Sequence, residues 1–373
     1  MKKAIDSRTI FVVVGRLGKS LTTSKLLPIV ATGLFTHIYV FRESEGDPIP
    51  SVIYITSLFQ IGLFPKMFSR VLQRVYELVQ LIYCTKNLNP EIINGYQLFP
   101  KGINSFIAAK VTKRKCIVST IGGIPEIDTY FRCKRLWRAI HIYVLSHSDA
   151  VTTKGKTVTD YIIRYGVNPD TIMTFNGAID MGKFSPDINL ERDIDLLFVG
   201  QLIELKGPDR FVRIVNKLSL QHPGLKAKIL GVGELENQVK RMIVNYSIED
   251  QVSIEGYIDN PEAYFCRSKI LVMPSRSEGL STAMLEAMAC GCLPVVSDVG
   301  CMNEAAISGL TSYTIKNYLD VDSFVVAIST LLFNDELRSS LAANAINLVR
   351  SKYSIKSQSA IFKDVVLMSG VKL

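Results

Sequence analysis

Short apolar runs rich in β-branched residues alternate with longer amphipathic stretches along this chain, and the alternation is completed twice. Such a pattern predicts parallel β-sheets covered by helices. At 373 residues the chain is too long for one ordinary domain, so we expect two α/β domains. The expected strands are 10–14, 38–41, 52–55, 92–93, 116–119 and 150–153 in the first half, and 196–199, 228–230, 252–254, 270–273 and 294–297 in the second.

A polar segment with one proline, SPDINLERD at 185–193, separates the two halves and is expected to be the linker. It places the first domain at 1–187 and the second at 188–354. The main helices are expected at 22–32, 64–84 and 209–218, with an amphipathic helix Ile355–Met368 at the end. Each strand of the second half stops at a small or turn-forming residue, and ligands of open α/β sheets bind at those carboxyl ends.

Charge is distributed unevenly over the halves. Residues 1–190 carry 24 Lys and Arg against 13 Asp and Glu, whereas residues 191–373 carry 19 against 21. A basic half suggests an anionic partner, such as a pyrophosphate-bearing substrate or an anionic membrane surface. No nucleic-acid-binding motif is visible, so nucleic acid is not expected as a partner. Seven cysteines without a CxxC pair, and a start without a signal-peptide core, predict a cytoplasmic protein with buried thiols.

The most informative stretch is PSRSEGLSTAMLEAMACGCLPVV at 274–296. A strand leads into a loop, and a helix begins near Ser281, with Ser281 or Thr282 as its N-cap. The backbone N–H groups and the dipole of such a helix start form an anion site. Glu278 precedes the helix and Glu286 lies about one turn inside it, so the two carboxylates can address different parts of one ligand. An amphipathic helix with incidental glutamates is the alternative interpretation.

A second stretch, VGQLIELKG at 199–207, places Lys206 in a short loop after a buried strand. A flexible ammonium at this position can reach a diphosphate. A lysine in a loop is more often simply exposed to solvent. Lys206 is therefore a candidate for ligand binding only in combination with the glutamate pair.

Together these blocks resemble the retaining glycosyltransferases of family 4, which have the GT-B fold of two Rossmann-like α/β domains facing across a cleft. The stretches 176–180, 228–233 and 253–257 are similar to further family elements, so the resemblance covers the second half nearly throughout and the first half loosely. It implies that the final segment 355–373 crosses back to the first domain. It also implies catalytic roles for Lys206 and Glu278, and donor binding by Gly200, Gln201, Gly233, Tyr257, Gly279, Leu280, Ser281, Thr282 and Glu286.

The chain departs from the family at two places. Gln201 stands where the family commonly has an arginine, and the loop after strand 116–119 has no histidine where many members have one. That loop instead contains Gly122 and Glu126, which we assign to the acceptor side. We also assign Gly15 and Gly18, in the loop after the first strand, to the acceptor side, on the weaker evidence of a G-x-x-G pattern.

The resemblance implies transfer of a sugar from a nucleoside-diphosphate sugar to a lipid-linked or polysaccharide acceptor, as in polysaccharide, lipopolysaccharide or glycolipid biosynthesis. It implies no cofactor and no metal ion. The basic first half is compatible with peripheral attachment to the inner face of the cell membrane. Two alternatives remain, a non-catalytic GT-B subunit and a nucleotide-sugar epimerase. A hydride-transferring enzyme is poorly supported, because no G-x-G-x-x-G opens either half between a strand and a helix.

Three basic residues recur at helical spacing in the expected helix 64–84, namely Lys66, Arg70 and Arg74. Replacing all three by glutamine is expected to reduce binding to vesicles with anionic phospholipid, since each contributes about 1 kcal/mol near such a surface. Vesicle sedimentation measures the change, with neutral phosphatidylcholine vesicles as the control. Unaltered binding would leave the helix as a cover of the sheet with a solvated basic edge.

Overall fold

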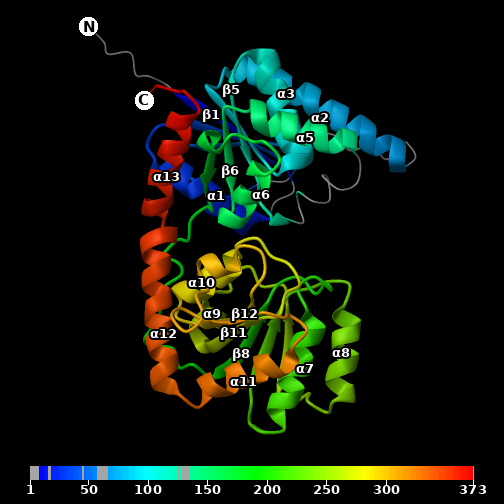
Figure 1. Ribbon diagram of the computed structural model, residues 1–373, viewed down its shortest axis with the longest axis vertical. Helices are drawn as coiled ribbons and strands as arrows, with labels where there is room; N and C mark the ends of the chain where they lie inside the picture. Colours follow the sequence, from blue (N-terminus) through cyan, green and yellow to red (C-terminus); the bar gives the residue numbers. More distant parts are fainter. Residues whose placement is uncertain are drawn as a thin grey trace. The chain divides into compact units, whose positions relative to one another are not determined.

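The computed structural model describes residues 8–15, 18–43, 46–56, 66–124, 127 and 135–372, and of residues 20 and 66–71 it describes the backbone. The chain divides into two compact units (Figure 1). The first consists of Met1–Ala178 with Ile355–Leu373, and the second of Ile179–Ser354. Each unit is built around a parallel sheet, as the alternating pattern predicts.

The sheet of the first unit has the order β3-β2-β1-β4-β5-β6-β7, and all its pairings are parallel. Central strand β1 is buried at all seven positions, because a parallel strand between two helical layers meets apolar side chains on both faces. The strands are β1 (Thr9–Gly15), β2 (His37–Arg42), β3 (Val52–Thr56), β4 (Ile92–Tyr96), β5 (Lys115–Ser119), β6 (Ala150–Thr153) and β7 (Ile172–Thr174).

The sheet of the second unit has the order β10-β9-β8-β11-β12-β13 and is also parallel. Its core gathers apolar side chains of the central strands and of the flanking helices α7 and α11. The strands are β8 (Ile194–Val199), β9 (Ala227–Leu230), β10 (Val252–Gly256), β11 (Ser268–Met273), β12 (Leu293–Ser297) and β13 (Tyr313–Ile315).

Helices connect successive strands, and several begin at residues suited to that role. Pro208 opens α7 after Gly207, and the side chains of Asp320 and Asn334 accept the first free N–H groups of α11 and α12. The helices of the first unit are α1 (Lys19–Ala31), α2 (Lys66–Leu88), α3 (Ile103–Thr112), α5 (Arg135–His147), α6 (Lys156–Ile163) and α13 (Ile355–Met368). Those of the second are α7 (Pro208–Ser219), α8 (Glu236–Asn245), α9 (Glu262–Arg267), α10 (Thr282–Ala289), α11 (Val321–Leu332) and α12 (Asp335–Leu348).

The segment 185–193, expected to be a linker, lies within the second unit, as do residues 179–187, which the sequence assigns to the first domain. Packing explains the difference. Phe184 packs against Phe265, and the Arg192 guanidinium donates to the backbone carbonyls of Ser268 and Cys290. The chain passes between the units at Ala178–Ile179 and at Ser354–Ile355. Ile179 and Ser354 form a parallel bridge, so the two passages lie side by side.

Helix α13 packs on α1 and completes the core of the first unit. Phe362 is fully buried, with its ring centroid 5.2 Å from that of Phe175. The side chain of Gln358 accepts a hydrogen bond from the backbone N–H of Asn176, which ties the helix to the loop after β7.

The strands expected from the sequence recur within a few residues of their expected bounds. The short strands β7 and β13 were not expected, because three residues are too few to show a period. Helix α2 is present, but the side chains of Lys66 and Arg70 lie outside the described residues. No helix in the described part of the chain combines the length and hydropathy that a membrane span requires.

Replacing Phe362 with alanine is expected to lower the free energy of unfolding of the first unit by about 3–5 kcal/mol, as for other fully buried phenylalanines. Chemical denaturation measures this loss. Leu367→Ala on the same helix is the matched control, because that side chain is 49% exposed and its removal is expected to cost less than about 0.5 kcal/mol. Equal effects of the two variants would contradict the place of α13 in this core.

Candidate active site

The candidate site lies where the strand order of the second sheet reverses direction. From β8 the chain proceeds to β9 and β10 on one side, then returns to β11, β12 and β13 on the other. The loops after β8 and β11 therefore leave the same edge of the sheet in opposite directions. In open α/β sheets, ligands bind at such a switch point, at the carboxyl ends of the strands. Lys206 follows β8 and Glu278 follows β11.

An ion pair joins these two loops. The Nζ atom of Lys206 lies 2.7 Å from each carboxylate oxygen of Glu278, and the hydroxyl of Ser275 donates to Glu278 Oε1 at 2.8 Å. The Glu278 side chain is 7% exposed and that of Lys206 25% exposed. A buried carboxylate is costly without partners, and here it has a cation and a hydroxyl. The ammonium has three donors, so it can hold Glu278 and still offer an N–H to a ligand.

Glycines allow the backbone of neighbouring loops to approach this pair closely. A Cβ atom at Gly300 would lie 1.9 Å from the carbonyl oxygen of Glu278, and Gly300 has a φ of +61°. A Cβ at Gly233 would lie 2.5 Å from the carbonyl oxygen of Leu202. Only glycine fits at such contacts. The N–H of Arg276 also donates to the carbonyl of Leu205, at 2.9 Å, so the loops at this edge are bonded to one another.

Helix α10 begins at the same edge. Ser281 is its N-cap, with its hydroxyl accepting from the N–H of Met284 at 3.3 Å. This confirms Ser281, rather than Thr282, as the cap. Glu286 lies in the middle of α10 and is 7% exposed, close to the 8% of Glu278. Glu278, in the loop before α10, and Glu286, within α10, are therefore both nearly buried. The start of α10 adds the positive end of the helix dipole.

The remaining donor-side residues lie on the carboxyl-edge loops of β8, β9 and β10. Gly200 and Gln201 follow β8, Gly233 follows β9, and Tyr257 follows β10. Gln201 is exposed, and the side chain of Tyr257 is 69% exposed. Gly279, Leu280 and Thr282 lie between Glu278 and the second turn of α10, with Leu280 buried.

The residues predicted for the acceptor side belong to the first unit. Gly15 ends β1, at the reversal of the first sheet, and the aliphatic part of Lys101 passes so close that a Cβ there would lie 2.5 Å from it. Gly18 precedes α1 with open space around it. Gly122 is half-buried after β5, and Glu126 lies outside the described residues.

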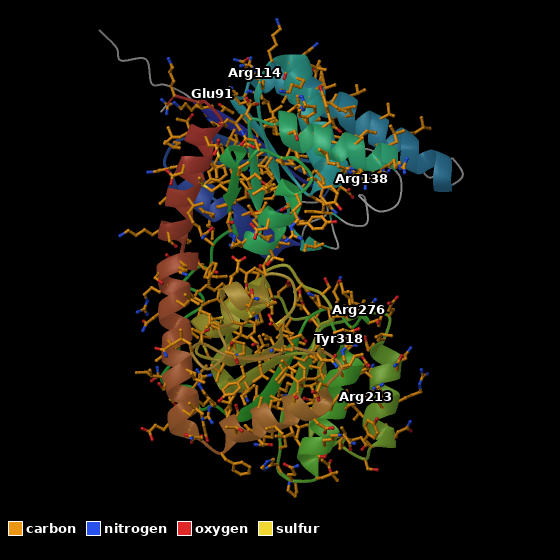
Figure 2. All side chains as sticks on the ribbon, viewed as in Figure 1. Glu91, Arg114, Arg138, Arg213, Arg276 and Tyr318 are labelled. Carbon is orange, nitrogen blue, oxygen red and sulfur yellow. The ribbon has the colours of Figure 1, made fainter. Side chains whose placement is uncertain are left out.

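Sequence reasoning missed three residues of the site. Ser275 holds Glu278, and Gly300 allows the approach to its carbonyl. Arg210, 4% exposed, donates to the carbonyl of Pro274 at 2.8 Å and lies 5.1 Å from the ring centroid of Tyr318. Tyr318 and Arg276 mark the loops after β13 and β11 in Figure 2. Only Ser275 had a sequence signal, its position in the glutamate block.

One Asp-x-Asp pair, a pattern that can hold a metal ion, lies at the start of β8. Asp193 and Asp195 flank the first residue of β8, at its amino end and therefore at the edge opposite Glu278. Arg267 Nε lies 2.8 Å from Asp193 and Lys269 Nζ lies 2.7 Å from Asp195. The Arg267 bonds hold the pKa of Asp193 below its ordinary value. Both carboxylates are thus already neutralised by cations.

Replacing Lys206 with methionine should leave the Glu278 carboxylate buried without its cation. We expect the free energy of unfolding at pH 7 to fall by about 1–3 kcal/mol, a value reduced from that of a fully buried pair because Lys206 is partly exposed. Adding Glu278→Gln to the variant should restore most of this loss. A double-mutant cycle by urea denaturation tests the pair, and additive losses would mean that the two residues do not interact.

The comparisons with known proteins find glycosyltransferases. Residues 181–348 match the family described as Glycosyl transferases group 1. A D-inositol 3-phosphate glycosyltransferase of Pseudarthrobacter chlorophenolicus is 26% identical over 197 residues, which cover 49% of this chain and 47% of that protein. An N-acetylgalactosamine-N,N'-diacetylbacillosaminyl-diphospho-undecaprenol 4-alpha-N-acetylgalactosaminyltransferase of Campylobacter jejuni is 29% identical over 156 residues, covering 40% and 42%. The chain spans about half the length of the curated relatives it matches.

Among solved structures, Anabaena HepE in complex with UDP and glucose superimposes with a TM-score of 0.77, over 97% of this chain and 99% of that one, at 13% identity. This likeness confirms the two-unit α/β fold expected for GT-B proteins. Residues 181–348, which make up most of the second unit, match the model of the glycosyl transferases group 1 family.

Proposed function

We propose that this protein is a retaining glycosyltransferase of the family 4 type, which takes a sugar from a nucleoside-diphosphate sugar. The observation that carries the proposal is the meeting of Lys206 and Glu278 at the switch point of the second sheet, beside the start of α10. This arrangement combines a cation, two nearly buried carboxylates and free backbone N–H groups at one edge of the unit that matches the family.

The leaving diphosphate gains negative charge as the bond to the sugar breaks, so catalysis requires positive groups already in place. Lys206 supplies one such group, and the N–H groups at the start of α10 supply others. We propose that Lys206 turns one donor to the diphosphate while Glu278 keeps it oriented. No metal ion is needed in this proposal, because these groups take the place of a bound cation.

Glu286 is assigned to the ribose hydroxyls and Glu278 to the hydroxyls of the transferred sugar. A carboxylate accepts hydrogen bonds from vicinal hydroxyls through both of its oxygens. We propose that the negative charge of Glu278 also stabilises a positive, oxocarbenium-like sugar. Its low exposure strengthens this interaction, since little water remains to screen it.

The acceptor is proposed to be lipid-linked or a growing polysaccharide, met by the basic first unit at the inner face of the cell membrane. The support comes from the net positive charge of residues 1–190 and from the relatives' names, one with an inositol phosphate and one with a diphospho-undecaprenol carrier. UDP-, GDP- and ADP-sugars are all compatible donors.

A thermal-shift screen with UDP-, GDP- and ADP-sugars tests the donor site, because a ligand that binds the native state raises the melting temperature. One nucleotide class should stabilise the protein, and Glu286→Ala should weaken its binding about tenfold or more through the lost bonds to the ribose. Glu249→Ala, at an exposed position of the same unit, is the control and should leave the shift unchanged.

This experiment, combined with an analysis of the products, distinguishes the three candidate functions. Stabilisation by a donor together with release of free nucleotide and a product of retained anomeric configuration, seen by NMR, supports the transferase. Donor binding without any transfer supports the non-catalytic subunit, and conversion of the nucleotide-sugar itself supports the epimerase. Stabilisation of Glu286→Ala equal to that of the parent protein would contradict the ribose assignment.

A further inference from the structure

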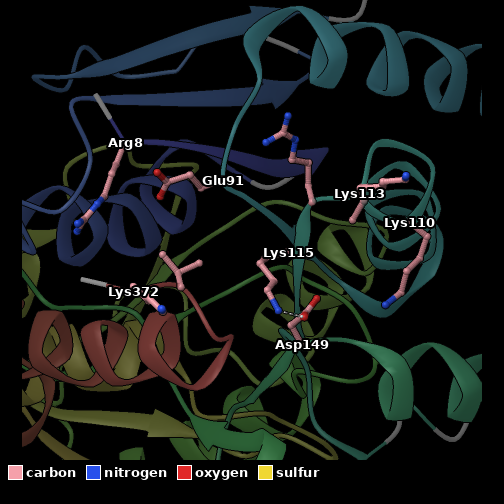
Figure 3. Close-up of a pocket in the computed structure, with 10 residues that line it drawn as sticks. Arg8, Glu91, Lys110, Lys113, Lys115, Asp149 and Lys372 are labelled. Carbon is pink, nitrogen blue, oxygen red and sulfur yellow. Dashed lines mark hydrogen bonds and ion pairs between the residues drawn. The ribbon is translucent and has the colours of Figure 1, made fainter. Parts of the chain in front are cut away.

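A basic cavity of about 640 Å³ opens at the amino edge of the first sheet, opposite the edge that carries Gly15 and Gly122. Residues at or just before the amino ends of four neighbouring strands line it: Arg8 before β1, Glu91 before β4, Lys115 in β5 and Asp149 before β6 (Figure 3). Lys110, Lys113 and Arg114, from the end of α3 and the turn after it, form another wall, and Lys372 follows α13. Figure 2 labels Glu91 and Arg114 at the same end of the unit.

Positive charge dominates the lining. Six residues are cationic and two are acidic, with Ala109 and Val371 as the apolar members. One of the acids is already neutralised, since Lys115 Nζ lies 2.8 Å from Asp149 and the N–H of Cys116 donates to the same carboxylate at 2.9 Å. The cavity therefore attracts anions and offers little to an apolar ligand.

The lining carries more positive charge than the neighbouring acidic side chains and helix ends can neutralise. Helix C-termini carry roughly half a negative charge each, and lysines near them commonly offset it. Glu91, Asp149 and the ends of α3 and α13 at this cavity together offset about three of the six positive charges. The Nε atom of Arg114 is buried with no hydrogen-bond partner among the described residues, although the other end of this guanidinium bonds to Asn89. Lys113 and Lys110 are exposed, and the Lys110 ammonium lies 5.1 Å from the ring centroid of Phe106.

We propose that this cavity binds a phosphate-bearing polyanion, at a site separate from the sugar-transfer chemistry. Several positive charges spread over a concave surface match a group with two or more phosphates better than a single carboxylate. The lining belongs wholly to the first unit, whereas the residues assigned to donor binding belong to the second. The source of the phosphates is either a free polyphosphate-type molecule or the headgroup of an anionic phospholipid.

Lysine footprinting on the full chain locates the site and distinguishes the two sources. Inorganic tripolyphosphate is expected to slow acetylation of Lys110, Lys113 and Lys372 by about threefold or more at saturation, and to leave Lys356 and Lys363 on exposed positions of α13 unaffected. Vesicles of phosphatidylcholine with phosphatidic acid form the second arm, and phosphatidylcholine alone is its blank. Protection in the first arm identifies a soluble ligand, and protection in the second arm alone identifies a lipid headgroup. Protection in neither arm, or equal protection at Lys356, overturns the proposal.

Charge reversal provides an independent readout. Lys110→Glu with Lys113→Glu removes the excess positive charge of the lining and should weaken binding of the protecting anion about tenfold or more by titration calorimetry. Lys356→Glu with Lys363→Glu makes the same change in net charge away from the cavity and should alter affinity by less than about threefold. Because all four positions are exposed, unchanged melting temperatures are expected to show that both variants fold.

Equal weakening by the two variants would assign binding to net charge and overturn the site. Donor binding, which uses Lys206 in the other unit, is measured separately, so its failure does not bear on this cavity.

Discussion

The ion pair between Lys206 and Glu278 depends on a single topological fact, that β8 and β11 lie side by side although more than sixty residues separate their carboxyl ends. A parallel sheet allows this because each connection crosses over and returns every strand in the same direction. The loops that follow then accumulate at one edge, and the strand reversal leaves space between the first two of them. The hydrogen bond from the N–H of Arg276 to the carbonyl of Leu205 and the close approach of Gly300 to Glu278 hold these loops together around the ion pair.

In a parallel sheet covered by helices, helices begin at the carboxyl edge and end at the amino edge, so the two edges differ in charge. At the carboxyl edge of the second sheet, the start of α10 offers unpaired N–H groups, which suit an anion without any side chain. At the amino edge of the first sheet, the helix ends offer carbonyls, so positive potential there has to come from side chains. The two proposed anion sites therefore use different chemistry. One uses the backbone assisted by a single lysine, and the other uses a group of Arg and Lys side chains.

The sequence predicts much of this fold because its signals are local. The buried strands near β1 and β8 and the helix α13 follow from periodicity, and the glutamate block indicates both carboxylates of the candidate site. The structure changes unit nine residues earlier than the expected boundary, at Ala178–Ile179, because Phe184 and, in the polar segment 185–193, Arg192 make contacts with partners some eighty residues away. The basic cavity was equally hidden, because its lining comes from the ends of several strands and helices. Such contacts between distant segments leave no trace in a local pattern.

The place of α13 affects the order in which the protein can fold during synthesis. The second unit is a continuous segment, Ile179–Ser354, whereas the first requires residues on both sides of it. A ribosome therefore releases every residue of the second unit before it releases Phe362, which fills the core of the first. Until then Phe175 and the face of α1 that meets α13 lack their cover. The half of the protein that is made first is thus the half that can be completed last, and during this interval its apolar surface is open to chaperones.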